Sequence, residues 1–184
     1  MQKHLVVAID GPSGAGKGTV ARAVAAVGEH AHFDLEGGRV TIDGQDVAAA
    51  IRTPEMDKAA AAVARHPAVR RVLVARQRGY GAGGGIVMEG RDIGTVVFPD
   101  ADVKIYLDAS PEERARRRAA DPAHTAHDVR IADVATALAD RDRSDTTRAA
   151  SPLAVAPDAV VIDTTDMPLE HVIQRVLESV GRKP

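Results

Sequence analysis

A glycine-rich run near the N-terminus combines the residue types that phosphate binding requires. The run is Gly11-Pro12-Ser13-Gly14-Ala15-Gly16-Lys17-Gly18-Thr19. Glycines let the backbone curl so that successive N–H groups point at phosphate oxygens, and a lysine adds a mobile positive charge. The spacing fits a Walker A loop, except that Gly18 separates Lys17 from the hydroxyl of Thr19. We therefore expect these nine residues to bind a triphosphate, with Ser13 and Thr19 as candidate contacts to phosphate or Mg²⁺.

The segments on either side of this run favour the same interpretation. The apolar segment Leu5–Ile9 precedes it and has the composition of a buried parallel strand. The alanine-rich stretch Val20–Val27 follows it and favours a helix, whose N-terminus attracts anions. A strand, a glycine loop and a helix in this order distinguish a phosphate-binding loop from an ordinary glycine-rich turn.

A second charged turn follows another predicted strand. Ile86–Glu89 has a strand pattern, and the turn Gly90–Thr95 after it contains Arg91 and Asp92. Open α/β sheets bind ligands at the carboxyl ends of their strands, so this turn is a second candidate site. Asp92 or Glu89 could orient an acceptor or place magnesium-bound waters; both carboxylates could equally be structural caps.

Two further predicted helices display arginines. The capping box that begins at Ser110 starts a helix with Arg114, Arg117 and Arg118 on one face. A second helix from about residue 129 to 145 presents Arg141 and Asp145, and Arg148 continues the same line. The polar segment 119–128 between them has the composition of a mobile loop. Such a face could bind a phosphorylated substrate, or it could simply be a solvated surface.

These elements predict the fold class. We expect an α/β fold in which a parallel core sheet is flanked by helices, with a small hairpin insertion and an arginine-bearing lid. The other predicted elements are a hairpin over 30–44 with its turn at Gly37-Gly38, helices over 53–65, from Pro67, and over 168–180, and strands over 103–107 and 160–162. We expect one domain over 1–184, with the hairpin and acceptor region at about 30–66 and the lid at about 111–148.

Composition excludes several classes of protein. The net charge of -2 and the pI near 6.4 give no reason to expect nucleic-acid or membrane binding. The chain has no cysteine, and only 2% of its residues are aromatic, which disfavours both thiol chemistry and base stacking. We find no bilayer-spanning run and no signal-peptide pattern, and therefore expect a cytoplasmic monomer.

Together, these features suggest phosphoryl transfer from a nucleoside triphosphate to a small acceptor. That reaction needs two substrates held in line, charge neutralised by Lys, Arg and Mg²⁺, and water excluded. No nucleophilic side chain is needed. A lid with several arginines can supply the charge and exclude the water.

Several of these motifs, in their order along the chain, resemble those of the bacterial cytidylate kinases. The matching stretches are Gly11–Thr19, Ile51–Glu55, Glu89–Ala101 and Arg141–Leu153. The sequence Glu-Gly-Arg-Asp-Ile-Gly-Thr-Val-Val-Phe-Pro-Asp-Ala from Glu89 is far more discriminating than the phosphate loop. The resemblance implies a P-loop nucleoside monophosphate kinase of pyrimidine metabolism. Such an enzyme transfers the γ-phosphoryl group of ATP to CMP or dCMP with Mg²⁺.

The resemblance also implies a role for individual residues. The ATP-binding residues are the nine of the run Gly11–Thr19. The CMP-binding residues are Arg70, Arg91, Asp92, Arg141, Asp145 and Arg148. The catalytic residues are Lys17, Arg117, Arg118 and Arg141. No residue is expected to be a direct metal ligand, apart from possible contacts of Thr19 or Ser13 with Mg-ATP.

Two departures from the family pattern fall on the acceptor side. The family has a short strand and an Asp-Ser/Thr-Gly-x-x-Tyr-Arg motif before its hairpin, whereas here Glu29–Phe33 continues directly into the hairpin and no tyrosine precedes Tyr80. The serine that the family uses near the base is Ala61 in this chain. We expect ATP binding to survive and CMP turnover to be weakened or less selective.

Three functions stay open at this point. The chain could be a working cytidylate kinase, a nucleotide-binding relative with little catalysis, or a P-loop kinase for a different small acceptor. The missing motif favours the second or third, and the intact loop and arginines favour the first. Nucleic-acid binding through the arginines is a distant fourth.

Overall fold

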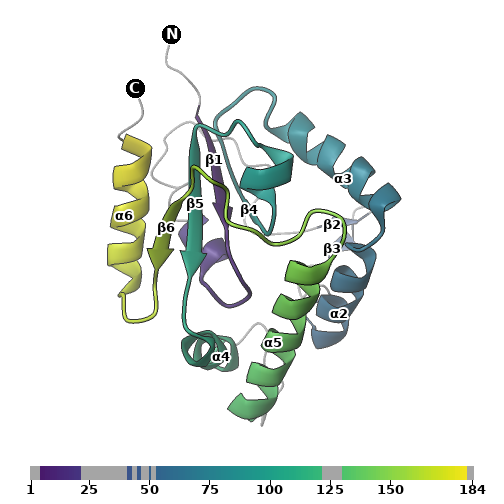
Figure 1. The fold of residues 1–184 in the computed structure, drawn as a ribbon, viewed down its shortest axis with the longest axis vertical. Coiled ribbons are helices and arrows are strands. Elements are labelled where there is room, and N and C mark those ends of the chain that lie inside the picture. Colours follow the sequence, from purple (N-terminus) through teal and green to yellow (C-terminus); the bar gives the residue numbers. More distant parts are fainter. Residues whose placement is uncertain are drawn as a thin grey trace.

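A four-stranded parallel sheet forms the centre of the molecule (Figure 1). The computed structural model describes residues 5–21, 41–42, 45–46, 50, 53–121 and 130–181. The strands are β1 (Val6–Asp10), β4 (Ile86–Gly90), β5 (Val103–Asp108) and β6 (Val160–Asp163), in the order β4-β1-β5-β6. In the register, Asp10 lies beside Gly90 and Tyr106. All four strands were predicted from the sequence, and their carboxyl ends meet at one edge as expected.

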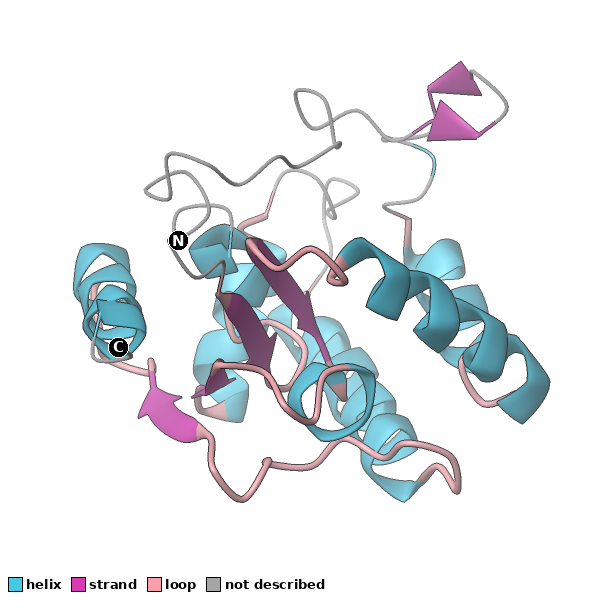
Figure 2. Ribbon diagram, turned by 90° about the horizontal axis from the view of Figure 1, so that it is seen from above, coloured by secondary structure: helices cyan, strands magenta, loops and turns pink. Residues whose placement is uncertain are grey.

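Alternate residues of the strands face two separate cores. Val7 and Ile9 of β1 pack with Ile105, Leu107 and residues of helix α6 (Leu169–Gly181) on one face. Ala8 faces the opposite side, where it packs with Ile93, Val97 and Val74 of helix α3 (Pro67–Tyr80). Figure 2 shows α6 on one side of the sheet and α3 on the other. This two-sided covering explains why β1 is apolar at consecutive positions.

The remaining helices begin where their capping residues predict. Helix α2 (Pro54–Val63) starts after Thr53, whose hydroxyl accepts a hydrogen bond from Met56 N at 3.3 Å. Helix α4 (Pro111–Ala119) starts after Ser110, which accepts from Glu113 N at 3.2 Å. Helix α5 (Ile131–Thr147) extends two residues beyond the predicted end, so that Arg148 is its C-cap. Helices α4 and α5 lie against each other below the sheet in Figure 1.

One element was not predicted. Residues Ile93–Val97, expected to be part of a turn, form a π-helix in which Phe98 N donates to Ile93 O at 2.7 Å. π-helical turns are rare and frequently occur at functional sites. This π-helix follows directly after Arg91 and Asp92, so it determines where those two side chains lie.

The hairpin differs in position from the prediction. Strands β2 (Thr41–Ile42) and β3 (Gln45–Asp46) pair antiparallel, with Asp43-Gly44 between them. Asp-Gly is a strong two-residue hairpin signal that the sequence interpretation passed over in favour of Gly37-Gly38. The turn expected at Gly37-Gly38 lies outside the described residues, as do most of the helix expected over 20–27 and the loop expected over 119–128. Within the described ranges, no helix is long and apolar enough to cross a membrane.

Candidate active site

The loop Gly11–Thr19, here called the donor loop, connects β1 to a helix that is described from Lys17 to Ala21. Gly11, Gly14 and Gly16 have φ angles of 149°, 80° and 87°, which disfavour residues with a side chain. A Cβ on Gly11 would lie 2.0 Å from Leu107 O, and one on Gly14 would lie 3.0 Å from the Cβ of Arg114. The glycines are therefore required both for the backbone conformation and for close packing.

Lys17 lies at the centre of the donor loop and is almost fully enclosed, with 6% of its surface exposed. Its Nζ donates a hydrogen bond to Pro12 O at 2.9 Å. Burial, helped by the positive charge of Arg91, lowers the pKa of Lys17 to about 7, although Glu89 and Asp142 oppose the shift. The nearby carboxylates thus do not offset the burial of the ammonium, and a bound anion would favour its charged form.

Buried Arg114 and partly buried Asp142 hold the donor loop from outside. Arg114 of α4 donates to Ser13 O at 3.2 Å and to Ala109 O at 3.0 Å. Asp142 of α5 accepts from Ser13 N at 3.2 Å and also pairs with Arg114. Both polar groups of the Ser13 backbone are thereby satisfied by the two helices. Sequence analysis placed Arg114 on an arginine face but missed this role, and it missed Asp142 altogether.

The second turn is fixed at both ends. Asp10 accepts hydrogen bonds from Ile93 N at 2.9 Å and Gly94 N at 2.7 Å, at the start of the π-helix. Arg78 of α3 donates to Val97 O at 2.9 Å and to Val96 O at 2.7 Å, at its end. Burial raises the pKa of Asp10, while the two amides oppose that shift. The turn that presents Arg91 and Asp92 is therefore held by β1 and by α3.

Six charged side chains gather beside this turn, and we call them the acceptor cluster. They are Arg70, Arg91, Asp92, Arg141, Asp145 and Arg148. Asp92 pairs with Arg70, and it lies 3.6 Å from Nη2 of Arg148. Arg91 donates to Asp145 at 2.9 Å and to Gly11 O at 3.1 Å, which joins the cluster to the donor loop. Ion pairs thus link five of the six residues that the resemblance implied for CMP binding, from α3, the second turn and α5, whereas Arg141 of α5 pairs with Asp57 of α2.

Three arginines of the cluster have spare hydrogen-bond donors. The Nε of Arg70, the Nε of Arg141 and the Nη2 of Arg148 are buried and have no hydrogen-bond partner among the described residues. Buried donors are nearly always satisfied in folded proteins, so such groups indicate a place where a ligand with acceptor oxygens binds.

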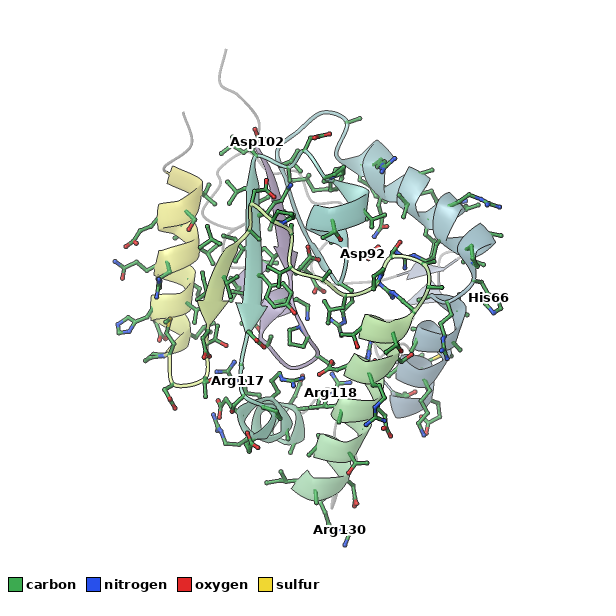
Figure 3. All side chains as sticks on the ribbon, viewed as in Figure 1. His66, Asp92, Asp102, Arg117, Arg118 and Arg130 are labelled. Atoms are coloured by element: carbon green, nitrogen blue, oxygen red, sulfur yellow. The ribbon has the colours of Figure 1, made fainter. Side chains whose placement is uncertain are left out.

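Arg117 and Arg118 are neighbours in sequence but point to different sides of α4 (Figure 3). Arg117 donates to Thr164 Oγ1 at 2.9 Å and pairs with Glu113, on the β6 side. Arg118 points toward α5 and pairs with Asp57 of α2, which also accepts from Arg141 at 2.8 Å. The two arginines thus belong to different parts of the site, and sequence analysis missed Asp57.

A pocket of about 600 Å³ opens on the Arg117 side of the donor loop. It is lined by loop residues Gly14–Gly16 and Thr19, by Arg117 and Arg118 of α4, and by the segment around Thr164–Leu169. Thr19 is exposed and lies at its edge, whereas Ser13 is buried. The described residues contain no cluster of three potential metal-ligating side chains. A Mg²⁺ ion that keeps its waters and binds mainly through substrate phosphates fits such a site, with Thr19 as the available hydroxyl.

Comparison with solved structures supports the fold. The chain is similar to an uncharacterized protein from Eubacterium ventriosum, with a TM-score of 0.62 and 10% identity over 97% of this chain and 99% of that one. It is also similar to an unliganded sugar kinase from Janibacter, with a TM-score of 0.57 and 18% identity over 97% of this chain and 95% of that one. At these identities the similarity concerns the fold alone.

Comparison with sequences is more specific. The family model for cytidylate kinase matches residues 26–182. Cytidylate kinases from Pelotomaculum thermopropionicum and Solibacter usitatus are 43% and 40% identical to this chain, over 96% and 97% of its length and 97% and 93% of theirs. The cytidylate kinase of Bacillus subtilis is 37% identical, over 100% of this chain and 99% of its own. On this evidence, the chain belongs to the cytidylate kinase family.

Proposed function

We propose that this protein transfers the γ-phosphoryl group of ATP to CMP or dCMP. The observation that carries the proposal is the juxtaposition of two sites. The donor loop lies next to a cluster of guanidiniums, three of which have a buried and unpartnered donor atom, and Arg91 bridges the two through its hydrogen bond to Gly11 O. Family membership favours a cytidine nucleotide as the acceptor.

On the donor side, the loop amides and Lys17 would hold the phosphates of ATP. The pocket beside Arg117 is of a size to take the rest of the nucleotide. Because the pKa of free Lys17 is lowered to about 7, phosphate oxygens would restore its positive charge on binding. Mg²⁺, held by the ATP phosphates and near Thr19, would neutralise charge on the phosphoryl group.

On the acceptor side, Arg70, Arg91 and Arg148 would bind the monophosphate of CMP. Asp92 and Asp145 orient these guanidiniums through ion pairs. We expect Asp145 to contact the sugar when CMP is present. The spare donors of Arg70 and Arg148 would then find oxygen partners.

Phosphoryl transfer requires that the two substrates be positioned and that the negative charge on the phosphoryl group be neutralised. Lys17, Arg118 and Arg141 would surround the phosphoryl group as its charge spreads in the transition state. An oxygen of the CMP phosphate attacks the γ-phosphorus of ATP and ADP leaves, so no side chain serves as nucleophile. Arg117, tied to Thr164 and Glu113, would act from the donor side.

We assign the main difference from relatives to the acceptor side. The alignment with the Pelotomaculum protein extends over 219 positions, which exceeds the 184 residues of this chain by 35, and the Solibacter and Bacillus alignments extend over 217 and 222. At least 35 aligned positions therefore have no counterpart here. We attribute part of this gap to the Asp-Ser/Thr-Gly-x-x-Tyr-Arg motif, and we expect a raised KM for CMP and a relaxed base preference.

An assay of ADP release with CMP, dCMP, UMP, AMP and GMP as acceptors tests the proposal. We expect the highest kcat/KM with CMP and dCMP, an ordinary KM for ATP, and measurable turnover of UMP. A low KM for CMP with strict cytosine preference would remove the inference of a weakened acceptor site. Tight ATP binding without turnover of any monophosphate would instead favour a nucleotide-binding relative, and a different preferred monophosphate would favour a different acceptor.

We expect the chain to work as a single domain and a monomer. Light scattering of the purified protein across a range of concentrations tests the oligomeric state.

A further inference from the structure

The carboxylate of Asp57 joins three separate helices. Asp57 lies on α2, and its two oxygens bind two different guanidiniums. Oδ1 accepts from Nη1 of Arg141 on α5 at 2.8 Å, and Oδ2 pairs with Nη2 of Arg118 on α4. Arg141 is the only member of the acceptor cluster in this contact, and the donor loop takes no part in it.

The two arginines that share Asp57 lie in a crowded field of positive charge. Arg141 and Arg91 both lower the pKa of Lys17, and the same two charges lower the pKa of Arg118. Burial contributes the largest part of both shifts. Like charges repel, and Asp57 is the carboxylate that pairs with both Arg118 and Arg141, while Asp121 also acts on Arg118.

We propose that Asp57 is a positioning residue for phosphoryl transfer, which holds Arg118 and Arg141 at a fixed separation. The proposal rests on the function proposed above and adds a residue to it. One oxygen binds each guanidinium, so both arginines are oriented by a single rigid carboxylate. Each arginine keeps further N–H groups for a phosphate, among them the buried and unpartnered Nε of Arg141.

An ordinary surface ion pair is a poorer description of this contact. The side chains of Asp57, Arg118 and Arg141 are 29%, 21% and 27% exposed, whereas those of the surface pair Asp140 and Arg143 are 65% and 71% exposed. The surface pair also lies within one helix turn, while Asp57 connects α2 to both α4 and α5. Asp140–Arg143 therefore provides a matched control of the same chemistry.

The main test is the kinetics of Asp57→Asn, Asp57→Glu and the control Asp140→Asn. We expect Asp57→Asn to lower kcat about tenfold with the best acceptor, because the arginines lose their common anchor, and to leave the KM for ATP within about twofold. Asp57→Glu keeps the charge and should recover part of the loss. Asp140→Asn should leave kcat unchanged, and all three variants should unfold within about 3 °C of the unaltered chain.

A double-mutant cycle then asks whether Asp57 acts through its arginine. If it does, Asp57→Asn should lower kcat much less in an Arg118→Lys background than in the unaltered chain. Equal losses in both backgrounds would overturn the proposal. So would an unchanged or raised kcat in Asp57→Asn, because a raised kcat would mean that Asp57 competes with substrate phosphates for the arginines.

A third measurement does not depend on turnover. In ¹⁵N spectra of the arginine side chains, the Nε signals of Arg118 and Arg141 are assigned with the variants Arg118→Lys and Arg141→Lys. Asp57→Asn should shift both of these signals. Absence of any shift would overturn the inference. Failure of the proposed function would be seen differently, as no ADP release by the unaltered chain with any monophosphate.

Discussion

The donor loop and the acceptor cluster lie next to each other but are built by different means. We propose that the donor loop binds phosphate through backbone amides, and its shape depends on three glycines with positive φ and on close packing against Leu107 and Arg114. The acceptor cluster consists of long charged side chains from α3, the second turn and α5, which hold one another by ion pairs. One site is therefore sensitive to added atoms, and the other to altered charge.

Lys17 is the one side chain on which the donor site should depend. Lys17→Ala removes the buried ammonium that lies among the loop amides, and we expect kcat to fall by about 10³-fold or more while the fold is retained. Steady-state kinetics together with circular dichroism checks this result. Transfer at a rate close to that of the unaltered chain would refute our interpretation of the loop.

The backbone of the donor loop should tolerate no added carbon at Gly11. In Gly11→Ala, the new Cβ would lie 2.0 Å from Leu107 O at a φ of 149°, so we expect a loss of about 3 kcal/mol or more in the free energy of unfolding. Gly79→Ala is the matched control, because nothing lies within 4 Å of its Cβ position and it sits inside α3. Urea unfolding of both variants separates them; equal stabilities would mean that the loop is less tightly packed than described.

Neutralising Asp92 should affect the acceptor and spare the donor. Asp92→Asn keeps the shape but leaves Arg70 and Arg148 without their shared counter-charge, so we expect the KM for CMP to rise about tenfold and the stability to fall by about 2 kcal/mol. The KM for ATP should change by less than about twofold. A larger effect on ATP than on CMP would contradict the separation of the two sites.

The lowered pKa of Lys17 predicts a smaller effect, a proton taken up with ATP. Free Lys17 has a pKa of about 7, so at pH 8 its amine is mostly neutral, and phosphate oxygens favour its charged form. ATP affinity should thus fall as the pH rises above about 7. In the free protein the unfolded chain binds more protons between pH 7 and 10.5, so the free energy of unfolding should rise over that interval.

Calorimetry in two buffers with different ionisation enthalpies measures this proton. We expect uptake of up to one proton per ATP at pH 8, and none in Lys17→Met. Identical binding enthalpies in both buffers would mean that Lys17 is already charged before ATP binds.

The sequence predicted the parts of the molecule whose conformation is determined by residues that are close together in the chain. Consecutive residues determine the strands, the caps at Thr53 and Ser110, and the donor loop. The structure confirms the strands and the caps, and it confirms the glycine-dependent conformation of the donor loop. The π-helix was missed because it depends on Asp10 and Arg78, which come from distant elements. The pairing of β2 with β3 was not predicted because two glycine-containing dipeptides competed for the turn, and the turn expected at Gly37-Gly38 stays a prediction.

Charged contacts between distant helices were the hardest to foresee. No sequence motif marks the contacts made by Asp57, Asp142 and Arg114. Each of these residues lies in a stretch that would suit a solvated helix face equally well. Their partners lie 84, 129 and 101 positions away along the chain. The resemblance supplied the acceptor cluster as a set of positions, but only the fold indicates which members hold one another.

Helix α5 limits how this protein could be redesigned. Arg141, Asp145 and Arg148 face the acceptor cluster, while Asp142, one residue along, holds Ser13 of the donor loop. Replacing α5 to change the acceptor would therefore also remove the contact of Asp142 with Ser13 and should weaken binding of the triphosphate. Acceptor specificity therefore cannot be changed by exchanging α5 as a whole. A mutant library for a new acceptor should vary the residues around Asp142 and keep Asp142 and Arg114 unchanged.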